Sequence, residues 1–243
     1  NSDGKYLIVE TDGTVSYRDT AANNTIASGD TVTFADIPAG VLGEKEPELD
    51  HGTMVPLYFI TKKYTEFKVV RIGLSGMPLE THYRVGMLIK KTAEELEERV
   101  VYIASGDLSH KLKPDGPYGL DPMGPVYDGK IMRVMGSGNF DELLDFDENL
   151  LEKAAECGHR SFVMMAGALD RTELEIQSLS HQDVTGVGYG ICTYLVKEEG
   201  KETEERAFLE KWKEKEKKRR EEEENRCRAE GKPYILSYDE ISS

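Results

Sequence analysis

The chain has 243 residues, enough for one large or two small domains, and 32% of them are charged. Its formal net charge of −15 repels nucleic-acid phosphates and anionic membrane surfaces, so neither is an expected partner. No apolar run is long enough to span a bilayer, and the chain begins at Asn1 rather than Met, as a fragment or a processed chain does. Three cysteines without Cys-x-x-Cys spacing disfavour a disulfide framework, which predicts a reducing, cytoplasmic location.

The charged residues gather at one end of the chain, which divides it into three predicted parts. Residues 1–37 hold the short runs "KYLIVE" and "TVSYRD" around the turn signal "TDG", and predict a β-rich segment. Residues 38–197 have ordinary globular composition and predict an α/β domain. Residues 198–243 predict a charged helical tail, since positions 198–230 are almost continuously Glu, Lys and Arg. A solvated helix is the favoured interpretation, and a docking helix for a partner domain is the alternative.

The central part predicts a strand, a helix and a second strand. "KVVRIGLS" (68–75) is a compact β-branched run typical of a buried strand, and residues 81–99 have helical periodicity. "VVYIAS" (100–105) follows as the next strand. This order is that of a right-handed crossover unit, which indicates an α/β sheet.

Four later segments complete the predicted fold. They are a Pro- and Gly-rich loop at 114–129, a helix at 139–157, a buried helix or strand at 161–169, and a final strand at 187–196. Together the segments predict an α/β fold with a central mixed sheet, helices on both of its faces, and a charged C-terminal helix.

His110 is the first candidate for chemistry. It follows a predicted strand directly, and Asp107 three residues earlier can orient its imidazole, as a general acid or base requires. The alternative is a helix N-terminus capped by Ser105 or Asp107, with His110 merely exposed. His82 and His181 are predicted to be surface residues.

Two further segments are candidates for site residues. His51 lies in "LDHGTMVPL" before Gly52, where the alternatives are a polar turn and a site residue packed closely by backbone. Cys157 and Glu156 precede Gly158 at a predicted helix end. Either could bind a metal, the thiolate favouring soft metals and the carboxylate iron or manganese. The alternative is a helix that ends at glycine and carries a buried cysteine.

Five blocks in this order resemble a known family. The chain is similar to the class III extradiol dioxygenase catalytic-subunit (LigB-like) superfamily, and most to the Memo-like proteins of the AmmeMemoRadiSam system. The resemblance covers about residues 38–196 and is specific to the superfamily, without fixing the reaction. The blocks are "LDHGTMVPLYFI", "IASGDLSHKL", "GPYG…GPVYD", "AAECGHRSFVMMAGAL" and "GVGYGICTY".

The resemblance implies an α/β fold and, in ring-cleaving members, a non-haem Fe(II) held by two histidines and a carboxylate. A catechol-type aromatic diol and O2 are the implied substrates. His110 matches the family's acid/base histidine, and His51 a second active-site histidine near the substrate. Cys157 takes the place of the third metal ligand, a Glu in dioxygenases and a Cys in Memo-like proteins, with Glu156 as its neighbour.

The sequence departs from this family pattern at its N-terminal end. The family's two metal histidines lie in the N-terminal third, whereas residues 1–50 contain no histidine, so the N-terminal part of the domain is expected to be shortened. Two functions follow as hypotheses. One is an Fe(II)-dependent extradiol dioxygenase, and the other is a Memo-like module, non-catalytic or metal-binding, that works with AMMECR1-type and radical-SAM partners. The Memo-like module would bind copper or no metal. A degenerate domain kept for structure is a third hypothesis. The family resemblance also implies a possible homo-oligomer.

Overall fold

The structure is a computed structural model that describes residues 50–198 and 201–233, and the backbone of four short strands within residues 5–33. β2 pairs antiparallel with each of β1, β3 and β4, and its pairing with β1 is that of the expected hairpin. The other residues of the N-terminal segment lie outside the described part of the chain. The strands are β1 (Lys5–Val9), β2 (Thr14–Asp19), β3 (Asn24–Thr25) and β4 (Val32–Thr33).

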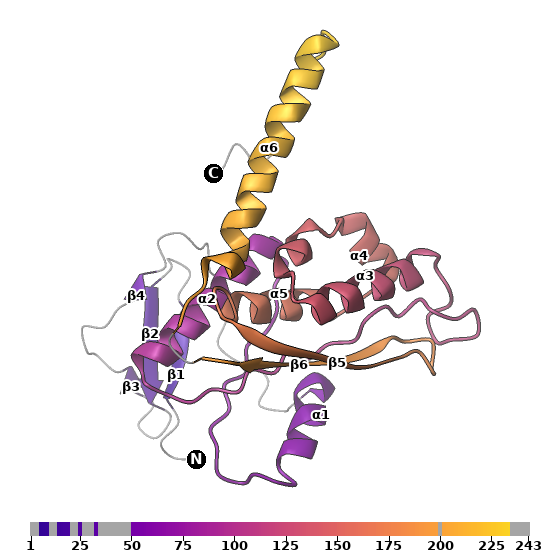
Figure 1. Cartoon of the computed structure of the whole chain (residues 1–243). Helices are drawn as coiled ribbons and strands as arrows, with labels where there is room; N and C mark the ends of the chain where they lie inside the picture. The colour runs from indigo at the N-terminus through magenta and orange to yellow at the C-terminus, as the bar shows by residue number, and fades with distance from the viewer. Residues whose placement is uncertain are drawn as a thin grey trace.

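Helices make up most of the remaining described chain (Figure 1). A single antiparallel hairpin, β5 and β6, lies along them, with a bulge between Ser178 and Ser180. The mixed α/β character predicted from the sequence is confirmed. The elements in chain order are α1 (His51–Ile60), α2 (Leu79–Glu95), α3 (Met123–Ser137), η1 (Phe140–Asp145), α4 (Glu148–Ala154), α5 (His159–Ala168), β5 (Leu174–Gln182), β6 (Tyr189–Val196), η2 (Glu204–Arg206) and α6 (Phe208–Ala229).

The predicted central sheet is corrected by the structure. In the described residues the strands form two separate antiparallel sheets, and the runs 68–75 and 100–105 are not strands. The helix predicted between them is present as α2. The two runs keep apolar side chains exposed, such as Val70 at 71% and Val101 at 86%. A strand needs ladder partners as well as β propensity, and the β5–β6 hairpin pairs only with itself among the described strands.

Later segments follow the prediction more closely, with shifted bounds. The predicted helix at 139–157 is divided into η1 and α4, and α4 ends at Ala154, just before Ala155, whose φ is +51°. The segment 161–169 is helical as far as Ala168, where α5 ends, and 187–196 contains β6 as predicted. The predicted loop at 114–129 is only partly a loop, because α3 already begins at Met123.

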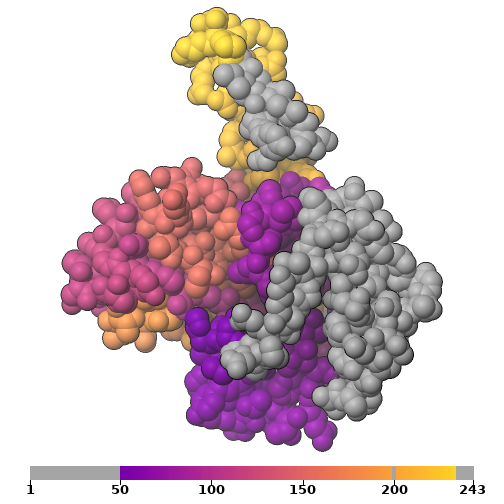
Figure 2. All heavy atoms as spheres, turned by 180° about the vertical axis from the view of Figure 1, so that it is seen from behind, coloured from indigo at the N-terminus to yellow at the C-terminus, as the bar shows by residue number. Residues whose placement is uncertain are grey.

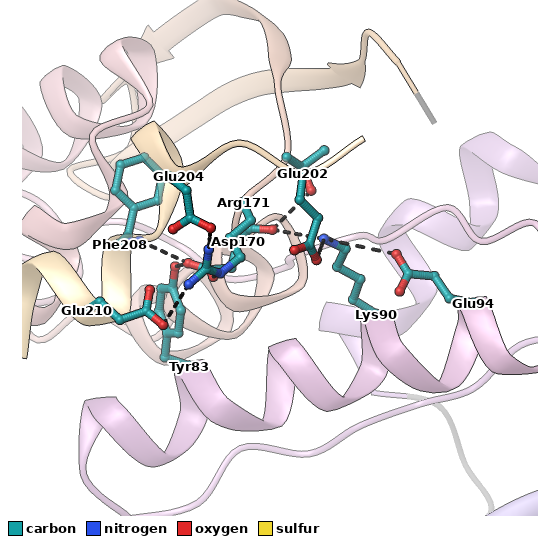
Figure 3. Close-up of polar contacts among 10 residues, drawn as sticks. Tyr83, Lys90, Glu94, Asp170, Arg171, Glu202, Glu204, Phe208 and Glu210 are labelled. Carbon is teal, nitrogen blue, oxygen red and sulfur yellow. Dashed lines mark hydrogen bonds and ion pairs between the residues drawn. The ribbon is translucent and has the colours of Figure 1, made fainter. Parts of the chain in front are cut away.

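The core lies where α2, α3 and α5 meet the hairpin and the start of α6. Its largest fully buried side chains include Tyr83, Tyr127, Phe140 and Ile131. A buried carboxylate joins three of these elements (Figure 3): the Asp170 Oδ1 atom accepts from the Tyr83 hydroxyl at 2.5 Å and from the Phe208 backbone N–H at 3.0 Å. The interior therefore depends on polar links as well as on apolar packing.

The charged C-terminal helix predicted from the sequence is confirmed as α6. Phe208 and Leu209 at its start are buried in the core, and its distal half projects beyond the rest of the molecule (Figures 1 and 2). Of the helices described here, none has both the length and the apolar composition needed to cross a membrane.

Candidate metal centre

The candidate site is built where the segment after residue 105 crosses the turn before α5. Gly106 makes the crossing possible, since a Cβ atom there would lie 2.3 Å from the Gly158 Cα. The close approach puts Asp107 beside Cys157, and the Asp107 backbone N–H donates to the Cys157 Sγ at 3.2 Å. Two segments that are 50 residues apart are thus held side by side.

Backbone hydrogen bonds fix the segment that carries His110. The His110 N–H donates to the Ala154 carbonyl at 3.0 Å, and the Leu108 N–H donates to the Gly188 carbonyl at 2.9 Å. The segment forms no helix, so the helix-cap interpretation of Ser105 and Asp107 does not hold. His110 is instead held on an irregular segment between the end of α4 and the turn before β6.

Three side chains converge at this crossing. The His110 Nε2 atom lies 3.3 Å from the Asp107 Oδ2 and 3.8 Å from the Cys157 Sγ. One ligand atom from each residue lies within 4.8 Å of the other two. The Tyr118 ring stacks on the imidazole, with 4.9 Å between centroids and 22° between planes. A nitrogen, a carboxylate oxygen and a sulfur at this spacing fit a transition-metal ion such as iron, copper or zinc.

The protonation of Cys157 bears on metal binding. Cys157 is exposed as a residue, yet its sulfur faces Asp107 and His110. The resulting desolvation raises the pKa of the thiol, and the nearby carboxylate of Asp107 acts in the same direction. The thiol is therefore protonated at neutral pH in the metal-free protein, and a metal ion bound there would displace that proton.

Glu156, the other predicted metal ligand, is hydrogen-bonded at the start of α5 and does not belong to this group. Its Oε2 atom accepts a hydrogen bond from the His159 backbone N–H at 2.5 Å, at the start of α5. Burial raises the pKa of its carboxyl. Within the described chain, the residues grouped closely enough to hold a metal ion are Asp107, His110 and Cys157, without Glu156.

His51 is exposed at the first position of α1, where Asp50 caps the helix through the Thr53 N–H at 2.8 Å. The Ser105 hydroxyl donates to the Gly52 carbonyl at 2.7 Å, which ties the start of α1 to the segment that leads to Asp107. His51 itself does not belong to the three-residue group.

Prediction from the sequence misjudged His82 and missed Asp128, whereas His181 is exposed as predicted. His82 was predicted at the surface but is only 3% exposed, because the apolar face of α2 carries it into the interior beside Pro78. Asp128 is 2% exposed, and its carboxylate contacts His181, whose side chain is 39% exposed. Asp128 follows Tyr127 on the buried face of α3. A charged residue among apolar positions of a helix was the sequence signal that could have identified it.

Two cavities of the described chain lie away from the three-residue group. One of about 710 Å³ is near the start of α6, and one of about 350 Å³ lies beside Glu156. Neither is lined by Asp107, His110 or Cys157.

Comparison with known proteins agrees with the resemblance seen in the sequence. The family described as "Catalytic LigB subunit of aromatic ring-opening dioxygenase" matches residues 23–192, somewhat more than the expected 38–196. Protein CA_C1420 of Clostridium acetobutylicum is 43% identical over 143 residues, which are 59% of this chain and 31% of that protein. The chain thus spans less than a third of the length of this relative. Since the family match covers well over half of its residues, the chain belongs to the LigB family of catalytic subunits of aromatic ring-opening dioxygenases.

Proposed function

We propose that the chain is a metal-dependent dioxygenase that opens the ring of a catechol-type aromatic diol with O2, using non-haem Fe(II). The observation that carries the proposal is the convergence of Asp107, His110 and Cys157 within 4.8 Å, in a chain of the LigB family. The donor set is one imidazole, one carboxylate and one thiolate, and its two negative charges match a divalent cation.

In this proposal the three side chains hold the metal. The bound Fe(II) would supply positions for the diol oxygens and O2, and would pass electron density from one to the other. Tyr118 stacks on the His110 ring and fixes its plane, while Asp107 lies within reach of the same Nε2 atom. With its Nε2 atom bound to the metal, His110 acts in this proposal as a ligand, in place of the acid/base role expected from the sequence. His51 is proposed to contact the substrate, since the start of α1 is tied to Ser105.

Removing the thiol tests the proposed site directly. In Cys157→Ala, Fe(II) affinity should fall at least about 100-fold. Even replacing a residue that only orients a metal ligand lowers metal affinity about 10–100-fold. Oxygen uptake with catechol should fall with it. Affinity is measured by competition with a chelator, and uptake with an oxygen electrode after anaerobic loading.

Two further variants complete this experiment. Cys227→Ala removes a thiol from the distal part of α6 and should leave Fe(II) affinity unchanged. Glu156→Gln tests the alternative ligand, and it should weaken binding far less than Cys157→Ala because Glu156 caps α5. Equal losses in the Glu156 and Cys157 variants would contradict the assignment. A wild-type protein that binds no iron and consumes no oxygen would refute the enzyme proposal.

A second candidate function is a metal-binding Memo-like module that works with an AMMECR1-type domain or a radical-SAM protein. The thiolate in the cluster favours this candidate. A soft ion such as Cu(I) suits a cysteine ligand. Tight Cu(I) binding that is lost in Cys157→Ala, without oxygen uptake in the iron-loaded protein, would select the module. Co-purification with either partner would support it.

A further inference from the structure

A buried carboxylate lies beneath the segment that carries His110. Asp128 projects from α3 and is only 2% exposed. Its Oδ1 atom accepts from the Ser109 backbone N–H at 2.8 Å, and its Oδ2 atom accepts from the His181 Nε2 at 2.7 Å. Burial raises the pKa of this carboxyl, while the hydrogen bond from His181 and that from Ser109 act in the opposite direction. A buried carboxylate is costly unless it is hydrogen-bonded, so these two donors are what allow it to remain there.

The surrounding backbone closes tightly on this pair. A Cβ atom at Gly188 would lie 2.1 Å from the Asp128 Oδ2 and 3.0 Å from the Leu108 Cβ. The Gly188 N–H donates to the Ser109 carbonyl at 2.7 Å. Because no side chain fits at position 188, the turn before β6 packs its backbone directly against the carboxylate. Asp128 thus has little freedom to change partners.

A short path leads from this carboxylate to the metal cluster. Ser109 is fully buried, and its hydroxyl donates to the Ala154 carbonyl at 2.9 Å. The same carbonyl accepts the His110 N–H at 3.0 Å. Ala154 ends α4 three residues before Cys157. Asp128 therefore holds the backbone from which the His110 ring extends, against the segment that carries the thiol.

We propose that Asp128 and His181 are positioning residues for the metal centre, which set the distance between the His110 imidazole and the Cys157 sulfur. His181 secures the Asp128 carboxylate, and Asp128 secures the Ser109 peptide. This inference rests on the metal-binding part of the proposed function. Outer residues that orient metal ligands typically change metal affinity 10–100-fold when they are replaced.

The test compares His181 variants with a buried pair of the same kind elsewhere in the core. Tyr83→Phe removes one hydrogen bond to the buried Asp170 carboxylate, away from the cluster, and serves as the matched control. Co(II) is the probe, because a thiolate ligand gives it a charge-transfer absorption band. His181→Ala should weaken Co(II) binding about tenfold or more and alter that band. Asp128→Asn, which keeps the size of the side chain, should act in the same direction.

A conservative variant separates positioning from general stability. His181→Gln keeps an N–H donor near the place of the Nε2 atom, and should recover most of the Co(II) affinity lost in His181→Ala. Tyr83→Phe should lower the melting temperature while leaving Co(II) affinity and the absorption band unchanged. If His181→Ala and Tyr83→Phe lose similar stability and both bind Co(II) as the wild type does, the inference is overturned.

A metal-free measurement keeps the inference separate from the proposed function. The NMR signals of the His110 imidazole should shift in metal-free His181→Ala and stay in place in Tyr83→Phe. Unchanged His110 signals in His181→Ala would refute the positioning role. Shifted signals in a protein that binds no Co(II) or Fe(II) would refute the proposed metal centre and leave the positioning role standing.

Discussion

At the scale of single residues, burial changes the tautomer and the pKa of His82, a side chain that was predicted at the surface. Its Nδ1 atom lies 3.1 Å from the Pro78 carbonyl, and its Nε2 atom faces the Ser75 N–H at 3.4 Å. The neutral tautomer with hydrogen on Nδ1 satisfies both contacts, whereas a proton on Nε2 would meet another donor. Burial lowers the pKa of His82, and the charge of Arg160 acts in the same direction.

This lowered pKa predicts how stability depends on pH. The unfolded chain takes up a proton near pH 6.5, whereas the folded chain does so only at lower pH, so acid favours unfolding. The contribution of His82 to stability is complete above pH 6.5 and is lost as the pH falls toward its folded-state pKa. Urea midpoints at pH 7.5 and 5.5 should therefore differ more in the wild type than in His82→Asn, which keeps a donor for Pro78. Equal differences in the two proteins would show that His82 titrates normally.

At the scale of elements, secondary structure that is encoded locally could be predicted from the sequence. The apolar spacing around Tyr83 and Met87 predicted α2, because a helix satisfies its own backbone hydrogen bonds. The runs 68–75 and 100–105 have the composition of strands, but a strand depends on partners that composition does not show. The site residues likewise differ in whether the sequence alone could identify them. His110, Asp107 and Cys157 stand in recognisable motifs, whereas the roles of Asp128 and His181 arise only from their contact in the folded chain.

The packing of α2 against α5 gives a prediction at this scale. A Cβ atom at Gly86 would lie 1.8 Å from the Met164 carbonyl oxygen, and one at Gly167 would lie 1.9 Å from the Tyr83 carbonyl oxygen. The two helix backbones are therefore in contact, and neither glycine can be enlarged without separating them. Gly86→Ala should destabilise the protein by about 2 kcal/mol or more, as overpacking does. Urea unfolding measures the change.

Gly129 provides the matched control for this substitution. It lies within α3, is exposed, and has open space where a Cβ atom would be. Gly129→Ala should stabilise the protein by about 0.5–1 kcal/mol, because alanine loses less backbone entropy than glycine on forming a helix. A loss of stability in Gly129→Ala, or no loss in Gly86→Ala, would contradict this account of the helix contact.

At the scale of the whole molecule, α6 is anchored at its start and projects at its end. Phe208 and Leu209 are buried, and the Trp212 indole N–H donates to the Asp145 carboxylate at 3.1 Å. Arg219 reaches the same carboxylate at 2.8 Å. Further along, the described ion pairs, such as Arg228 with Glu224, join residues of α6 to each other.

This division predicts that the two halves of α6 contribute unequally to stability. A chain that ends at Arg220 keeps the anchored turns and should melt within about 2 °C of the full chain, since exposed ion pairs contribute little. A chain that ends at Ala207 exposes the surface that Phe208 and Leu209 cover. It also lacks the Phe208 backbone N–H, which donates a hydrogen bond to Asp170. Losing two buried side chains costs about 3–6 kcal/mol, which corresponds to about 10 °C in a protein of this size. Differential scanning calorimetry of the three chains measures both effects. Similar melting temperatures for the two shortened chains would show that α6 is not anchored through its first turns.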